Sequence, residues 1–141
     1  MTTSTPANAS SSKSYSVASI KDDLGQQLMQ EVEARCAELE ELAEDEDLPF
    51  NAASMAILRG FVRTSATIMP AVVLTDGGHL RAIWRSGDNE QAALIFRSVG
   101  EIQFVFFAEA NGVVSRASGV APLSKIAGLL VSHGVSKLVR G

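Results

Sequence analysis

The stretch LTDGGHLRAIWR, residues 74–85, gathers the side chains of this chain that are best suited to chemistry. His79 follows closely after Asp76, and Arg81 and Arg85 come next. An imidazole beside a carboxylate can act as a general base, and arginines can hold an anionic substrate. A nucleophilic triad needs a third, activated group, and the nearest hydroxyl in sequence lies inside an expected turn. We therefore predict no catalytic residues. A small enzyme or ligand-binding domain with a site near His79 is kept as an alternative.

Metal and nucleotide motifs are incomplete in the rest of the chain. The two histidines, His79 and His133, have no second His, Cys or carboxylate at a recognised ligand spacing. Residues 118–125, SGVAPLSK, lack the glycine that precedes the lysine of a phosphate-binding loop. The DGG sequence joins two strands, whereas a dinucleotide fingerprint opens a helix. We therefore predict no metal and no cofactor.

Turn residues and alternation place the basic cluster on one face of a strand. Asp76-Gly77-Gly78 has the composition of a tight turn. Beyond it, apolar residues recur at every second position, which predicts a strand whose core face carries Leu80, Ala82 and Trp84. The opposite face then carries His79, Arg81, Ile83 and Arg85. We interpret this face as a candidate contact surface for a partner.

The same alternation continues along the chain, with glycine-containing turns between the runs. It predicts an antiparallel meander of four or five strands, with a two-residue hairpin turn at Asn111-Gly112. In the predicted strand 101–109, Val105 and Phe107 are apolar on the face opposite the core residues. A strand that is apolar on both faces is either covered twice or exposes one face to a partner. Val105 and Phe107 therefore join the candidate contact surface.

Helical periodicity flanks the meander on both sides. An apolar stripe predicts a helix over residues 20–43, and a second stripe predicts a helix over 49–64. Pro122 suits the first turn of a final helix, and Gly134 suits its C-terminal cap. We place the acidic run of residues 40–50 at the start of the second helix, because carboxylates at a helix C-terminus oppose the macrodipole.

This element order predicts an α+β fold with two N-terminal helices, a four- or five-stranded antiparallel meander sheet and one C-terminal helix, in two layers. We expect residues 1–19, rich in Ser and Thr, to form a disordered tail, and residues 20–141 to form a single domain. No apolar run approaches the roughly 20 residues that span a bilayer, and residues 1–19 lack the apolar stretch of a secretory signal. The lone cysteine, Cys36, fits a reducing compartment. We therefore expect a cytoplasmic protein without a membrane partner.

Charge is distributed unevenly between the two parts of the chain. Residues 1–47 hold three basic and eleven acidic residues, a net charge of −8, whereas residues 48–141 hold nine basic and five acidic residues, a net charge of +4. Such asymmetry indicates electrostatic contact surfaces. The acidic helix either packs on its own basic domain, remains a solvated face, or docks on a second copy or a foreign basic protein. Its candidate contact residues are Glu38, Glu41, Glu44 and Asp45.

The segment MPAVVLTDGGHLRAIWRSGDNEQAALIFRSVGEIQFVFFAEANG resembles small bacterial α+β proteins of the antitoxin or immunity type, through its DGG turn and its strand that ends in Trp. The size, acidity and mixed layout are also similar to type III secretion chaperones, small dimers that bind unfolded parts of effectors. Their order of strands and helices differs, because this chain has two helices before an uninterrupted meander. Neither resemblance supplies catalytic residues.

These observations lead to the hypothesis of a non-enzymatic, cytoplasmic protein-binding module that neutralises or chaperones a partner such as a toxin or an effector. A homodimer is compatible with the apolar strand face. The alternative is a nucleic-acid-binding protein that uses a basic open face of the sheet. In that case His79, Arg81, Arg85 and Arg97 would line the open face of the sheet, with Phe107 as an aromatic neighbour. The sequence contains no RNP-type motif that would favour this alternative.

Overall fold

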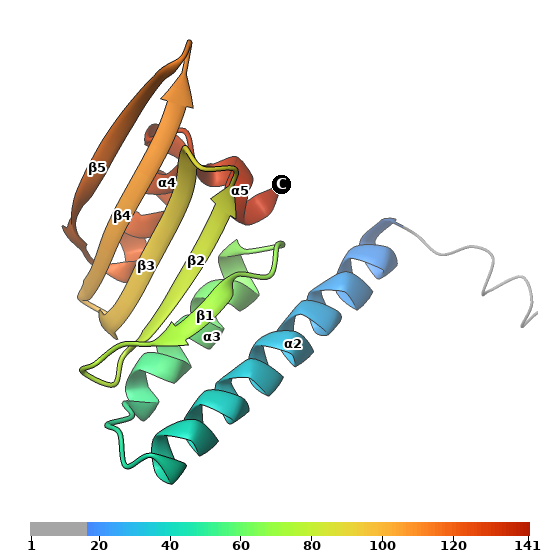
Figure 1. Cartoon of the computed structure of the whole chain (residues 1–141). Coiled ribbons are helices and arrows are strands. Elements are labelled where there is room, and N and C mark those ends of the chain that lie inside the picture. The colour runs from blue at the N-terminus through green and yellow to red at the C-terminus, as the bar shows by residue number, and fades with distance from the viewer. Residues whose placement is uncertain (1–16) are drawn as a thin grey trace, which may run out of the picture.

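The computed structural model describes residues 17–141 of the chain. Helices α2 (Val17–Asp45) and α3 (Ala52–Ser65) are followed by strands β1 (Ala71–Leu74), β2 (Leu80–Ser86), β3 (Glu90–Ser98), β4 (Glu101–Ala110) and β5 (Val113–Ala121), and then by α4 (Leu123–Ser132) and α5 (Ser136–Arg140). The strands form one antiparallel sheet in the order β1-β2-β3-β4-β5 (Figure 1). The predicted α+β meander is confirmed, with five strands. Residues 1–16 of the predicted tail lie outside the described residues, and α2 begins at Val17, before the expected residue 20.

One face of the sheet holds the core. The side chains that alternate inward from β2, β3 and β4 are nearly inaccessible to solvent, because α3, α4 and α5 cover them (Figure 1). Full burial of each large apolar side chain stabilises the fold by about 1.5–3 kcal/mol. The inward residues are Leu80, Ala82, Trp84, Ala92, Leu94, Phe96, Ile102, Phe104 and Phe106. They match the alternation in the sequence residue by residue.

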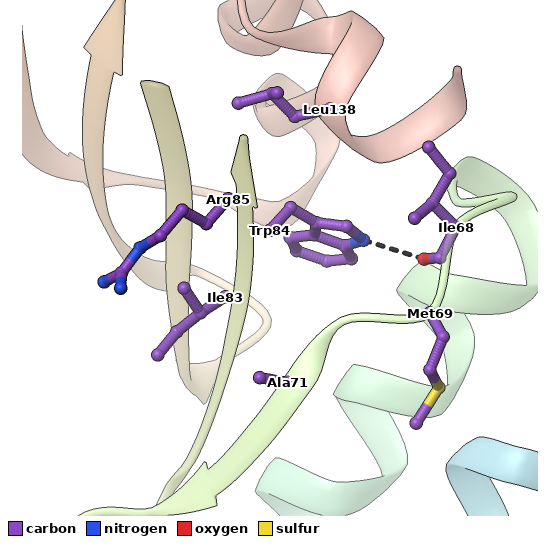
Figure 2. Close-up of a pocket in the computed structure, with 7 residues that line it drawn as sticks. All are labelled: Ile68, Met69, Ala71, Ile83, Trp84, Arg85 and Leu138. Atoms are coloured by element: carbon purple, nitrogen blue, oxygen red, sulfur yellow. Dashed lines mark hydrogen bonds between the residues drawn. The ribbon is translucent and has the colours of Figure 1, made fainter. Parts of the chain in front are cut away.

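Trp84 connects the sheet to the segment between α3 and β1. Its indole Nε1 donates a hydrogen bond to the backbone oxygen of Ile68 at 2.8 Å (Figure 2). Its ring meets that of Phe61 edge to face at a centroid distance of 6.0 Å. The backbone amide of Ile68 in turn donates to the oxygen of Val139 in α5 at 3.1 Å. One buried side chain thereby holds three parts of the chain that are distant in sequence.

Helix α2 packs on α3 and on strand β1 of its own chain. Its buried stripe comprises Leu28, Val32, Cys36, Leu39 and Ala43. Arg35 Nε donates a hydrogen bond to the backbone oxygen of Val72 at 3.0 Å, which satisfies an acceptor on the free edge of β1. An ion pair between Glu33 and Arg59 joins α2 to α3. This helix therefore shields one edge of the sheet.

The prediction that the acidic run begins the second helix is wrong. Helix α2 continues through Asp45, so the acids of residues 40–45 lie in its last turns, and α3 begins only at Ala52. Burial of the stripe on the inner side of α2 outweighs the small repulsion between solvated carboxylates and the helix dipole. The helix ends in a Schellman motif, with Asp47 at a φ of 55° and the Leu48 amide donating to the oxygen of Ala43 at 2.8 Å.

The C-terminal region contains two helices where the sequence predicted one. Gly134 adopts a φ of 73° and ends α4 as expected, and the chain then turns through the buried Val135 into α5. A helix of five residues is too short to show a periodic pattern, which is why it was not predicted. His133 is exposed at the C-cap of α4, with its ring 5.7 Å from that of Phe106.

The β1–β2 turn docks on the linker between α2 and α3. Gly78 adopts a φ of 86°, and its backbone oxygen accepts a hydrogen bond from the Asn51 amide at 2.8 Å. A Cβ atom at Gly78 would lie 2.8 Å from the backbone carbonyl of Pro49. The buried Ser54 hydroxyl accepts from the Leu80 amide at 2.8 Å, so the start of α3 and the start of β2 are joined. This docking requires glycine at position 78.

We predict that Gly78→Ala lowers the free energy of unfolding by about 2–4 kcal/mol, because it combines an unfavourable positive φ with a collision against backbone atoms. Gly77→Ala is the matched control, since a Cβ there meets only the His79 side chain, at an ordinary 3.5 Å. Urea unfolding of both variants measures the difference. Equal stability of the two variants would contradict the proposed docking.

Candidate functional site

The face of the sheet opposite the helices is not covered by any described element, and we call it the open face (Figure 1). The pairing of the strands arranges its side chains in three rows that cross the sheet. The first row is Arg85, Gln91, Phe107 and Arg116. The second row is Ile83, Ala93, Val105 and Ser118. The third row is Arg81, Ile95, Gln103 and Val120.

Five of the predicted contact residues lie together on the open face. Ile83 and Val105 flank Ala93 in the second row, and Arg85 and Phe107 flank Gln91 in the first. Figure 2 shows Ile83 and Arg85 projecting from the side of β2 opposite to Trp84. Arg81 lies on the same face in the third row. The period-2 alternation and the strand register therefore bring these side chains together.

Two arginines of the open face, Arg85 and Arg116, are held by neutral groups. Arg85 donates through Nη2 and Nε to Gln91 Oε1, at 2.7 and 3.2 Å. The Arg116 guanidinium lies over the Phe107 ring, 5.9 Å from its centroid, and donates to the Ser118 hydroxyl at 3.3 Å. Within the described part of the chain, Arg81, Arg85 and Arg116 form no ion pair with a carboxylate. The face thus presents three arginines that form no ion pair with a carboxylate of the described residues, and the nearest acid on the same face of β4 is Glu109, in the row beyond Phe107.

Apolar side chains occupy the middle of the open face. Ala93 is buried, and Ile83, Ile95, Val105 and Phe107 are half-buried, since neighbouring strands cover their flanks and solvent reaches their ends. The combination of an apolar centre with surrounding arginines is unlike the charged, mixed surface that usually keeps a sheet face soluble. A ligand that fits this face would carry carboxylates and apolar groups together.

Sequence reasoning missed Arg116, Gln91, Gln103 and Ile95 as members of this face. Strand β5 contains small and polar residues, so its alternation is weak. The hairpin turn at Asn111-Gly112 could have predicted the position of Arg116. A two-residue turn fixes the pairing Ala110↔Val113, and this register places Arg116 opposite Phe107. Arg97, considered for nucleic-acid contact, forms an ion pair with Glu101 at 3.0 Å.

His79 lies in the turn beside the open face and not among its rows. Its ring is near Gly77, and its backbone amide donates to the Thr75 hydroxyl at 3.1 Å. The Thr75 hydroxyl therefore closes the turn, and within residues 23–141 no hydrogen bond or ion pair joins His79 to Asp76. This geometry gives the Asp76-Gly77-Gly78 stretch a structural role in the hairpin.

The acidic contact candidates Glu38, Glu41, Glu44 and Asp45 are exposed on α2. Glu38 approaches Arg35 at 3.6 Å, one turn away on the same helix. Figure 1 shows α2 beyond β1, at the end of the sheet away from β4 and β5. The acidic helix therefore does not cover the apolar outer side of strand 101–109, as the helix and the strand lie at different ends of the sheet. The acidic and basic candidates form two separate surfaces.

A pocket of about 440 Å³ lies beside Trp84 and is lined by Ile68, Met69, Ala71, Ile83, Trp84, Arg85 and Leu138 (Figure 2). Its charged group is Arg85, and the Ile68 oxygen within it already accepts from Trp84. It offers no carboxylate, imidazole or thiol to a reaction. Among the residues that the structure describes, no three His, Cys, Asp or Glu side chains come close enough to hold a metal ion.

Comparison with known proteins gives no indication of the function of this chain. No protein family, curated protein or solved structure matches this chain. The resemblance to antitoxin and immunity proteins therefore stays a prediction. None of the described helices is both long and apolar enough to cross a membrane.

Cys36 is the one thiol of the chain, and it is fully buried between α2 and its neighbours. Burial raises the pKa of the Cys36 thiol, and the nearby guanidinium groups of Arg59 and Arg35 offset only part of this effect. A thiol with a raised pKa holds less of the reactive thiolate at neutral pH. Cys36 thus serves the core and is poorly placed as a nucleophile.

We predict that iodoacetamide at pH 8 modifies Cys36 in the folded protein at least about 100-fold more slowly than in unfolding concentrations of guanidinium, because reaction requires opening of the core. Mass spectrometry of timed samples measures both rates. Similar rates in the two conditions would contradict the burial of this side chain.

Proposed function

We propose that this protein is a non-enzymatic protein-binding module, whose open face receives an acidic and partly apolar segment of a partner protein and so neutralises or chaperones that partner. The observation that carries the proposal is the set of three arginines without carboxylate partners around an apolar centre. Arginine matches carboxylates with two parallel hydrogen bonds, which gives orientation as well as affinity. The apolar centre then contributes by losing contact with water.

The orientation of the arginines supports this proposal. Gln91 fixes the Arg85 guanidinium, and Phe107 and Ser118 fix that of Arg116, so a ligand needs to order these side chains less on binding. Under this proposal the chain acts as an antitoxin, an immunity protein or a chaperone, and its partner, such as a toxin or an effector, supplies the segment. The proposal includes no membrane partner and no catalytic step.

Phe107 favours a protein over a nucleic acid as the ligand. Proteins that bind single strands without sequence preference stack bases on exposed aromatic rings. On the open face Phe107 is the one aromatic residue of the three rows, and the Arg116 guanidinium lies over its ring. A base would have to displace this contact, whereas a carboxylate can bind the arginine where it lies.

The test is photo-crosslinking in the native host from a benzoylphenylalanine residue at position 105. We expect the captured protein to be cross-linked through a segment rich in acidic and apolar residues. In isothermal titration with that purified protein, Arg81→Gln/Arg85→Gln/Arg116→Gln should raise Kd at least about tenfold, because each lost charged hydrogen bond weakens binding by about 1 kcal/mol. Added salt should weaken binding by the unsubstituted protein.

Glu41→Gln/Glu44→Gln is the matched control, since it changes charges on the separate acidic surface of α2. This variant should bind as the unsubstituted protein does. An equal loss of affinity in both variants, or none in either, would contradict binding at the open face. Cross-linking that nuclease treatment removes would replace the proposal with the nucleic-acid alternative.

A further inference from the structure

Strand β5 leaves one edge of the sheet unpaired. It pairs with β4 along its full length, and among the described residues no strand pairs with its outer side (Figure 1). The opposite edge differs, because α2 lies against β1 and Arg35 satisfies the Val72 oxygen. A nine-residue edge with free amide and carbonyl groups is a template for a further strand.

The sequence of β5 lacks the features that usually protect an edge. It contains no proline, no lysine and no acidic residue, and its pairing with β4 has no bulge. Its one charged residue is Arg116. Val114 and Val120 point to the open face and are 44% and 59% exposed. Edge strands that stay unpaired are normally short, bulged or charged, so this strand is suited to pairing.

We propose that β5 pairs with β5 of a second copy of this chain, antiparallel and with the two-fold axis at Ala117, to form a continuous ten-stranded sheet. This inference concerns assembly and stands independently of the proposed ligand of the open face. With the axis at Ala117, all nine residues of both strands find a partner. The pairs are Val113 with Ala121, Val114 with Val120, Ser115 with Gly119, Arg116 with Ser118, and Ala117 with itself.

This pairing is self-complementary in its apolar side chains, and it places the two Arg116 side chains diagonally across the axis and not directly opposite each other. Arg116 meets the neutral Ser118 of the second copy, so no like charges lie directly opposite each other. Val114 meets Val120 twice across the axis, which reduces the solvent exposure of four valines. Cross-strand apolar pairs of this kind stabilise antiparallel sheets, and like charges directly opposite would destabilise them. The complementarity favours a second copy over an unrelated strand.

The helix side of β5 is also free for a second copy. Its inward positions are the small residues Ser115, Ala117 and Gly119, and a Cβ at Gly119 would lie 3.1 Å from the Phe104 ring. Beside them runs an apolar groove of about 490 Å³, lined by Phe104, Val120, Ala121, Lys125, Gly128, Leu129 and Ser132. The helix layer therefore ends at α4 and does not obstruct a strand beside β5. In such a dimer the two open faces would join into one surface.

Sedimentation velocity of the full chain over a range of protein concentrations tests the proposal. We expect a monomer–dimer equilibrium. Ser118→Arg should raise the dimer Kd at least tenfold, because it sets an introduced arginine opposite Arg116 at two symmetric places. Ser118→Glu should lower the dimer Kd several-fold, since the introduced carboxylate faces the same Arg116. Opposite effects at one position identify the register, because a dimer formed elsewhere responds alike to both.

Ser86→Arg is the matched control, an equal charge change at an exposed position of β2 remote from β5. Circular dichroism and urea unfolding at low concentration establish that each variant folds. A chain that stays monomeric at all concentrations overturns the proposal. A dimer that Ser118→Arg and Ser118→Glu leave unchanged overturns it equally, as does a foreign strand captured on β5 in place of a second copy.

Discussion

The burial of one face of the sheet against α3, α4 and α5 is the interaction on which the rest of the structure depends. Side chains such as Phe96, Phe106 and Leu94 are inaccessible because the helices cover alternate residues of every central strand. A sheet buried on one face only must leave its other face and its edges to solvent or to other proteins. The parts of the sheet that the helices leave uncovered are the open face and the β5 edge.

The two edges and the open face of the sheet differ in which groups contact them. The β1 edge is closed by α2, with Arg35 bonded to the backbone of Val72, whereas the β5 edge has free backbone groups and small side chains. On the open face, Gln91 holds Arg85, and Phe107 and Ser118 hold Arg116. Among the described residues, neither arginine forms an ion pair with a carboxylate. The free edge and the arginine-bearing face adjoin each other at β5. Assembly through the edge would double the surface available to a partner, and a single copy would still present its own open face.

Much of the fold could be predicted because its signals are local. The Asp76-Gly77-Gly78 turn and the alternation after it assigned Trp84 to the core and Ile83 and Arg85 to the opposite face, as the structure shows. The errors arose where a local preference competes with packing. The acidic end of α2 opposes the helix dipole, but burial of Leu39 and Ala43 extends the helix to Asp45. Helix α5 is too short to have a detectable period, and it forms because Leu138 and Val139 are buried in the core.

The sequence by itself determined which residues turn, which alternate and therefore which side chains share a face of each strand, because these depend on neighbours one or two positions apart. Only the tertiary structure decided that Arg85 and Arg116 lie in one row, since that row crosses three strand pairings. It also decided that α2 closes the β1 edge of its own chain and leaves the face of β4 and β5 open. The docking of a helix depends on the total apolar area that it buries, and this sum over distant residues is not visible in a local pattern.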